Sequence, residues 1–136
     1  MSNQAKTAKL TNGYKSHHKV INYKVADQGG AVGDIGLKMF VPANAFITRV
    51  YLEKVTAFTS DGAATFSLYL LAANDILTAT QYDNAIFTGT FGATTPVDTP
   101  ASFLKNTESI EKEIIARIGT ADLTAGEYNI HVEYIA

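Results

Sequence analysis

The stretch VPANAFITRVYLEKVTAFTS, residues 41–60, decides the fold class. Its Pro-Ala-Asn start (residues 42–44) forms turns readily, and the fourteen residues from 45 to 58 contain no Gly or Pro. Their side chains alternate with a period of two and include many β-branched and aromatic residues, which predicts a strand. At about 3.3 Å per residue this strand would be about 45 Å long, well above the usual length. We therefore expect a long central strand of an all-β domain, buried on one face and partly wet on the other.

Length and composition agree with one domain that has a core of its own. The chain has 136 residues, of which 46% are apolar and 18% charged, and it contains no cysteine. The lack of cysteine excludes disulfides, a thiolate nucleophile and a cysteine-ligated zinc ion. No run approaches the eighteen apolar residues that a membrane span needs. The first residues also lack the apolar segment of a signal peptide, so we expect synthesis in the cytoplasm and no membrane partner.

Charge divides the chain into a basic start and an acidic remainder. Residues 1–24 hold five of the eleven basic side chains and none of the thirteen acidic ones, so their formal charge is +5 against −7 for the rest. Residues 1–17 also lack periodicity and contain few apolar side chains. We interpret residues 1–17 as an extended arm that contacts another molecule, with a solvated terminus as the alternative. Residues 18–136 are then the folded domain.

The alternating pattern continues along this domain and predicts about eight strands in all. Besides the long strand, we expect strands at residues 18–26, 31–40, 64–74, 85–91, 101–106, 108–118 and 127–135. The turn at Asp61-Gly62 predicts a hairpin between the long strand and residues 64–74. A second hairpin is expected to join residues 108–118 to 127–135.

Three other segments carry weaker signals. Residues 108–118 fit a helix as well as a strand, and their β-rich neighbours favour the strand. Asn74 is a possible cap for a short helical turn within residues 74–84. Residues 92–100 are expected to form a loop, and Gly33 and Gly36 indicate a bulge or close backbone approach. Short strands joined by turns predict a two-sheet antiparallel β-sandwich of the jelly-roll type.

No catalytic template fits the sequence. The glycines at 29, 30, 33 and 36 precede an alternating strand instead of the helix that a dinucleotide-binding loop requires. Glu111 and Glu113 would share a strand face about 7 Å apart, a spacing found in glycosidase pairs, although a solvated face explains them better. His131 is expected to be a surface or interface side chain, and Arg49 and Glu53 to form a surface ion pair worth under about 1 kcal/mol. We therefore predict that the protein is not an enzyme and that it binds no cofactor and no metal ion.

Two binding functions need separate consideration. Nucleic-acid binding needs a basic stripe with interleaved aromatic residues, and the acidic domain excludes it. The seven tyrosines and seven phenylalanines would allow a sugar-stacking face, so a carbohydrate-binding module on a surface appendage is the alternative function. Most of these aromatic residues fall at positions that the alternation assigns to the core, and tryptophan, a common sugar-stacking residue, is absent.

Residues 35–136 resemble a group of small virion proteins of tailed bacteriophages. The resemblance rests on VPANAFITRVYLEKVTAFTS, on FSLYLLAANDIL (residues 66–77) and on DLTAGEYNIHVEYI (residues 122–135). It implies a jelly-roll decoration or cement protein on the capsid exterior, in many cases a homotrimer, with the major capsid protein as its partner. The arm lies outside the matched region, and its role as a capsid-clasping segment is our own hypothesis. The expected contact residues are Lys6, Lys9, Tyr14, Lys15, His17, His18 and Lys19.

Overall fold

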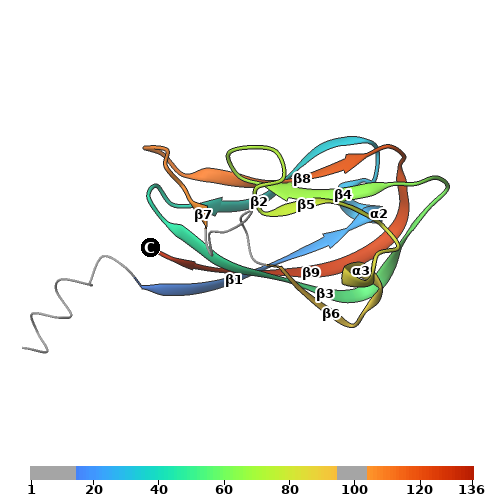
Figure 1. Ribbon diagram of the computed structural model, residues 1–136, viewed down its shortest axis with the longest axis horizontal. Helices are drawn as coiled ribbons and strands as arrows, with labels where there is room; N and C mark the ends of the chain where they lie inside the picture. The colour runs from blue at the N-terminus through green and yellow to red at the C-terminus, as the bar shows by residue number, and fades with distance from the viewer. Residues whose placement is uncertain (1–14, 95–103) are drawn as a thin grey trace, which may run out of the picture.

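Alternating side chains give this protein two antiparallel sheets that pack face to face. The computed structural model describes residues 15–94 and 104–136, and Figure 1 shows the two layers. The five-stranded sheet contains β1 (Ser16–Lys24), β3 (Phe46–Ser60), β6 (Phe91–Thr94), β7 (Leu104–Lys105) and β9 (Leu123–Ile135). The four-stranded sheet contains β2 (Gly33–Val41), β4 (Thr65–Tyr69), β5 (Leu77–Gln81) and β8 (Lys112–Gly119). Two short helices, α2 (Val25–Gln28) and α3 (Ala85–Thr88), complete the fold.

The strands pair in a nested order. β1 pairs with β9, β2 with β8, β3 with β6 and β4 with β5. In addition, β9 pairs with β3 and β8 pairs with β4, which joins these strand pairs into two sheets. This gives strand orders β1-β9-β3-β6 and β2-β8-β4-β5, with β7 added beside β3. Such connectivity is that of a jelly roll, so the predicted β-sandwich is confirmed.

Both predicted hairpins are wrong. β3 and β4 lie in different sheets, as do β8 and β9, so each intervening turn carries the chain from one layer to the other. The residues around Asp61-Gly62 do form a tight turn, as Ser60 Oγ accepts a hydrogen bond from Gly62 N at 3.1 Å. The residues of the turn determine the local bend. They do not determine which strands pair, because β3 pairs with β6 and β9, which are distant in sequence.

Bulges adjust the long strand to its neighbour. Between Ile47 and Arg49 the register against β9 slips by one residue, and Ile47 and Val50 are consequently both buried although strict alternation places them on opposite faces. Further shifts follow between Lys54 and Ser60. β2 is also irregular, with a shift between Gly36 and Phe40, as its glycines predicted. A bulge changes which face a side chain occupies, which the sequence pattern alone does not reveal.

Several element boundaries differ from the sequence-based expectation. The strand expected at 85–91 is wrong in its first half: Asn84 Oδ1 accepts a hydrogen bond from Ile86 N and caps α3. The expected loop at 92–100 is wrong at its start, because β6 reaches residue 94. Asn74 caps no helix; it lies in a turn with φ of 65°, and β5 follows. Of the strand expected at 108–118, residues 108–111 precede β8 (Lys112–Gly119), and the strand interpretation is confirmed over the helical one from residue 112 onward.

The core lies between the two sheets and is rich in aromatic side chains. Five of its aromatic side chains form one cluster in which neighbouring ring centroids are 4.4–6.2 Å apart: Tyr23, Phe58, Phe66, Phe87 and Tyr128. Burial raises the pKa of the Tyr23 hydroxyl to about 12, and this hydroxyl donates to Gly29 O at 2.6 Å. Buried rings with satisfied hydroxyls give the sandwich a rigid end.

One buried amide holds the turn that precedes the long strand. Asn106 is fully buried, and its Nδ2 donates to the carbonyl oxygens of Val41, Pro42 and Ile110 at 3.0, 3.0 and 3.1 Å. Its Oδ1 accepts from Glu108 N at 3.1 Å. The backbone of Asn106 also bonds to the end of the turn, where its C=O accepts from Asn44 N and its N–H donates to Ala45 O. This side chain therefore fixes the chain path at residues 41–45.

Candidate partner-binding surface

Four of the predicted contact residues lie on or beside strand β1, at the edge of the five-stranded sheet. His17, His18 and Lys19 belong to β1 itself, and Lys15 precedes it and exchanges two backbone hydrogen bonds with Ala136, at 2.6 and 2.9 Å. All four side chains are exposed. The remaining three, Lys6, Lys9 and Tyr14, lie outside the described residues. The structure thus places part of the predicted contact set on one sheet edge.

His17 and Lys19 face the same aromatic side chain. The imidazole ring of His17 stacks on Tyr134 of β9 with centroids 4.9 Å apart, and Lys19 Nζ lies 5.9 Å from the centroid of the Tyr134 ring. Strand parity explains this arrangement, because alternate residues of β1 and β9 project to the inner side of the sheet. Near the C-terminal end of β1, the same side carries the buried Tyr23. The inward-facing side chains of β1 are therefore buried at Tyr23 and exposed at His17 and Lys19.

His18 projects to the outer side and joins a polar chain across three strands. His18 Nε2 lies 3.0 Å from His131 Nδ1, and His131 Nε2 lies 2.9 Å from Glu53 Oε1. The hydrogen bonds from His131 and then from Asn129 lower the pKa of Glu53. His131 thus lies on the surface, with Glu53 as its partner. Among residues 15–94 and 104–136, no group of three His, Asp or Glu side chains is arranged to hold a metal ion.

The expected ion pair between Arg49 and Glu53 is replaced by separate contacts. Arg49 donates to the hydroxyl of Tyr51, and its guanidinium lies 5.2 Å from the centroid of that ring. Glu53 is engaged by β9, as described above. Arg49 and Glu53 both lie on β3. Arg49 is bound by Tyr51 of the same strand and Glu53 by His131 of the adjacent strand β9, so the two side chains do not pair with each other.

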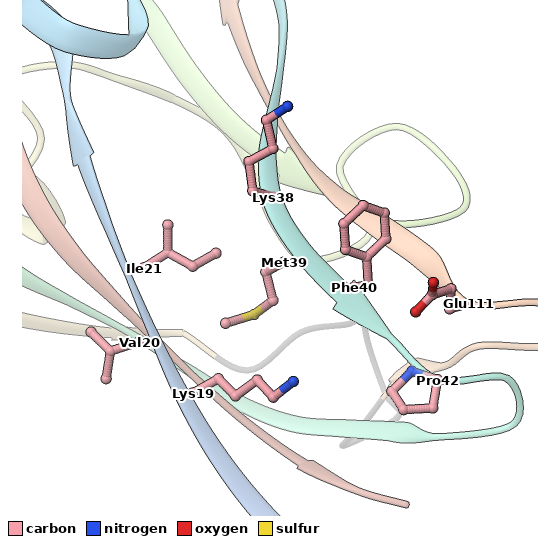
Figure 2. Close-up of a pocket in the computed structure, with 8 residues that line it drawn as sticks. All are labelled: Lys19, Val20, Ile21, Lys38, Met39, Phe40, Pro42 and Glu111. Atoms are coloured by element: carbon pink, nitrogen blue, oxygen red, sulfur yellow. The ribbon is translucent and has the colours of Figure 1, made fainter.

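A groove opens between β1 and β2, the adjacent edges of the two sheets. Its volume is about 490 Å³, and it is lined by Lys19, Val20, Ile21, Lys38, Met39, Phe40, Pro42 and Glu111. Figure 2 shows Ile21 and Met39 pointing into the space between the two strands. Val20 and Phe40 are 50% and 42% exposed, which is high for apolar side chains. The groove thus combines an apolar floor with two lysines and one carboxylate.

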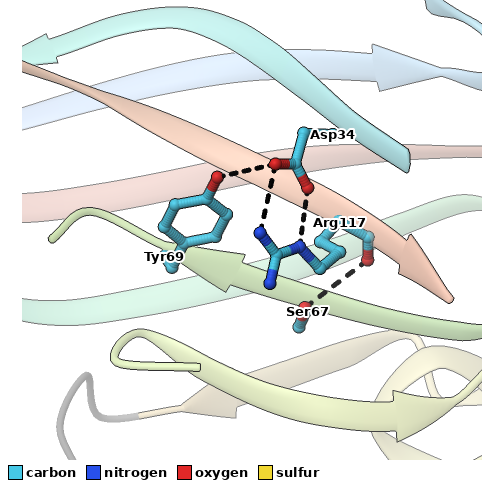
Figure 3. A network of polar contacts seen from close by, with 4 residues as sticks. All are labelled: Asp34, Ser67, Tyr69 and Arg117. Atoms are coloured by element: carbon cyan, nitrogen blue, oxygen red, sulfur yellow. Dashed lines mark hydrogen bonds and ion pairs between the residues drawn. The ribbon is translucent and has the colours of Figure 1, made fainter. Parts of the chain in front are cut away.

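The outer side of the four-stranded sheet carries a separate polar network, drawn in Figure 3. Arg117 of β8 binds both carboxylate oxygens of Asp34 at 2.6 and 3.1 Å, and the Tyr69 hydroxyl donates to Asp34 at 2.9 Å. These bonds, first from Arg117 and then from Tyr69, lower the pKa of Asp34. The network joins β2, β8 and β4, and its members are bonded to one another, which is the arrangement of a structural clamp.

The glutamates considered as a catalytic pair have separate surroundings. Glu113 Oε2 accepts a hydrogen bond from Lys38 N at 2.9 Å and so supports the bulge of β2. Glu111 precedes β8 and lines the groove. The aromatic residues proposed for sugar stacking mostly lie in the core, with Phe40 the one large aromatic side chain exposed among the described residues. In the same part of the chain, no helix is long and apolar enough to cross a membrane.

Comparison with known proteins finds similarity in structure but no match to a family model or curated sequence. A chain of the acidic stable capsid structure of Helicobacter pylori bacteriophage KHP30 superposes with a TM-score of 0.59 and 15% identity, covering 90% of this chain and 93% of the other. A chain of the cyanophage Pam1 capsid asymmetric unit gives a TM-score of 0.62 and 14% identity, covering 90% and 86%. Both chains come from phage capsids, and at this identity the likeness establishes the shared fold.

The groove and its position were not foreseen from the sequence. The basic character of β1 is visible in the charge distribution, but the groove needs β2 as its second wall, and these two strands are not hydrogen-bonded partners. The contact between His18 and His131 likewise depends on the pairing of β1 with β9. One feature of the sequence indicates the groove: the apolar residues Val20, Met39 and Phe40 lie next to lysines in β1 and β2, the strands that form its two walls.

Proposed function

We propose that this protein is a non-enzymatic structural protein of a phage virion that binds the capsid exterior and stabilises it. The observation that carries the proposal is the jelly-roll fold shared with two phage capsid chains over 90% of this chain. The exposed basic edge at β1 and the groove beside it supply a surface for contact, and the major capsid protein is the proposed partner. The protein would be made in the host cytoplasm and assemble on the capsid as a homotrimer.

The other side chains support contact over catalysis. Glu53, His131, Asp34 and Arg117 all engage in strand-to-strand bonds on the outer sides of the sheets. A catalytic pair needs groups aimed at a common substrate position, whereas these groups are aimed at one another. Burial in the core of six of the eleven aromatic side chains whose burial the structure describes also disfavours the carbohydrate-binding alternative.

The deciding experiment is electron cryomicroscopy of purified virions together with quantitative mass spectrometry. We expect density for the sandwich on the outer capsid surface and hundreds of copies per particle. Absence from the particle, or presence only in a few tail copies, would reject the proposal. Glycan-array binding by the purified protein would instead favour the sugar-binding module, and sedimentation analysis tests the homotrimer.

The arm is tested by a deletion that leaves β1 intact. Because β1 begins at Ser16 and Lys15 is bonded to Ala136, removal of residues 1–14 preserves every described contact of the domain. We expect an unchanged far-ultraviolet circular dichroism spectrum and weaker binding to capsids lacking the protein. The Lys6→Ala/Lys9→Ala variant is the matched control for charge alone. Full capsid occupancy after the deletion would exclude a role for the arm.

A further inference from the structure

Strand β1 has a regular hydrogen-bonding edge that faces away from its sheet. Its nine residues pair with β9 without a register shift, from Ser16 opposite Ile135 to Lys24 opposite Glu127. Lys15 and Ala136 exchange both backbone hydrogen bonds, so the odd-numbered residues of β1 point their backbone groups toward β9. The even-numbered residues therefore turn their N–H and C=O groups outward, as antiparallel geometry requires.

A side chain already occupies the C-terminal end of this edge. Gln28 Oε1 accepts from Lys24 N at 2.7 Å, and Gln28 Nε2 donates to Asn22 O at 2.8 Å. This amide thus makes the same two bonds that an added strand would make at that position. Within the described residues, no hydrogen bond reaches the outward backbone groups of Ser16, His18 and Val20. The open part of the edge is consequently five residues long and lies beside the groove.

The other wall of the groove is a poor partner for an added strand. β2 is interrupted by the register shift between Gly36 and Phe40, and Lys38 within it has φ of 63°. Bulges and such backbone conformations protect a sheet edge from pairing. β1 lacks these features between Ser16 and Val20. The protein therefore presents one receptive edge and one protected edge across the same groove.

We propose that β1 binds an extended segment of a partner protein as an additional antiparallel or parallel strand, and that this segment is acidic with apolar residues beside its acid. The inference deepens the proposed function, since on a virion the segment would belong to the capsid shell. Backbone bonds to Ser16, His18 and Val20 hold the segment. Its inward side chains would place a carboxylate beside Lys19 and an apolar group over Ile21 and Met39.

The charge of the groove favours an acidic partner segment over the protein's own arm and over β1 of a second copy. Lys19 and Lys38 both line the groove, with Glu111 as the one acidic group. The arm carries only basic charged residues before β1, so it would be repelled. Pairing of two copies through β1 would bring their lysines together, which is unfavourable for directly opposed strands. An inward lysine at a sheet edge discourages indiscriminate pairing and selects a segment that brings the opposite charge.

The test uses the full-length protein labelled with ¹⁵N and a synthetic heptapeptide, acetyl-Thr-Val-Thr-Glu-Thr-Val-Thr-amide. Its palindromic sequence places the Glu beside Lys19 in either strand direction. We expect the amide resonances of His18 and Val20 to shift and their hydrogen exchange to slow on binding. The matched peptide with Lys in place of Glu should bind about tenfold more weakly. The Lys19→Glu variant should reverse this preference.

A backbone substitution separates strand addition from simple charge attraction. Val20→Pro removes an outward N–H and spares the bonds to β9, a position where an edge strand tolerates proline. With Val20→Ala as its control, we expect the proline variant to bind the acidic peptide about fivefold to tenfold more weakly, the loss expected for one hydrogen bond. Circular dichroism of both variants checks folding, and Lys19→Glu tests the proposal independently of that result.

The outcomes distinguish this inference from the proposed function. Equal binding of the Glu and Lys peptides, shifts confined to residues away from β1, or equal affinity of the Pro and Ala variants would each overturn strand addition. Virions that contain the protein but take up the Lys19→Glu and Val20→Pro variants at full occupancy would do the same, while leaving the proposed function intact. Peptide binding at β1 by a protein absent from virions would support the inference and reject the capsid role.

Discussion

Replacement of Asn106 by alanine should destabilise the fold more than any other single change to a polar side chain outside the sheets. The side chain supplies two N–H hydrogens to three carbonyl oxygens and accepts one backbone N–H. A hydrogen bond contributes about 1 kcal/mol net, and each buried polar group left unsatisfied costs about 1–3 kcal/mol. Because Ile110 is 64% exposed, water can reach its carbonyl. The net loss is therefore about 3 kcal/mol of unfolding free energy.

Urea denaturation followed by circular dichroism measures this loss. With a slope of about 1.5–2 kcal/mol per molar urea, the midpoint should fall by about 1.5–2 M. Asn84→Ala is the matched control, because Asn84 is exposed and caps α3 with one hydrogen bond, a contribution of about 1 kcal/mol. Asn106→Asp should be at least as damaging as alanine, since it keeps the shape but turns oxygen toward three carbonyls.

A small effect would refute this reasoning. If Asn106→Ala shifts the midpoint no more than Asn84→Ala, then residues 41–45 keep their path without the buried amide. The turn would then be fixed by Pro42 and by the backbone bonds of residue 106 alone. Loss of the groove in the alanine variant is also expected, as Pro42 forms part of its wall.

Three further predictions test the core, a close approach and the clamp. Burial raises the pKa of Tyr23 to about 12, so folding favours its neutral form and stability should fall between about pH 10 and 12; Tyr23→Phe should flatten that fall in denaturation at alkaline pH. Gly126→Ala should cost about 1–3 kcal/mol, measured by urea denaturation, because φ is 143° and the new Cβ would strike Phe58. The hydrogen bond from Arg117 lowers the pKa of Asp34, so its stabilising effect is present above about pH 4 and disappears as the pH falls through the lowered value. Asp34→Asn should therefore show a smaller loss of melting temperature on acidification than the natural protein, and an equal loss would contradict the clamp.

The strands themselves could be predicted from sequence because each is a local pattern. Alternation at residues 46–60 and 127–135 requires only that one face be buried, and both segments are strands. The same reasoning failed at Phe87, which lies in a helical turn because Asn84 caps it. It also failed at Ile47, where a bulge changes the face. Short-range patterns report burial well and report single-residue irregularities poorly.

The pairing of strands could not be predicted in this way. A turn such as Asp61-Gly62 is compatible with a hairpin and with a crossing between sheets, and the choice depends on β9 and β6, which flank β3. The binding surface has the same limit. His17, His18 and Lys19 were expected to contact a partner, but the role of Gln28 at the sheet edge follows only from its position one helical turn after β1.

The nested pairing also sets an order of events for folding. Of the four nested pairs, β4 with β5 is the one that is near in sequence, while His18 and His131 are 113 residues apart. Each outer pair closes a longer loop than the one inside it, at a growing entropic cost, so we expect slow folding, in milliseconds to seconds, that begins at β4–β5 and moves outward. β1 then joins after all other strands are in place. Until β1 pairs with β9 both of its edges are exposed, and Lys19, which discourages indiscriminate pairing at the outer edge of the folded protein, would also hinder premature association of the unpaired strand.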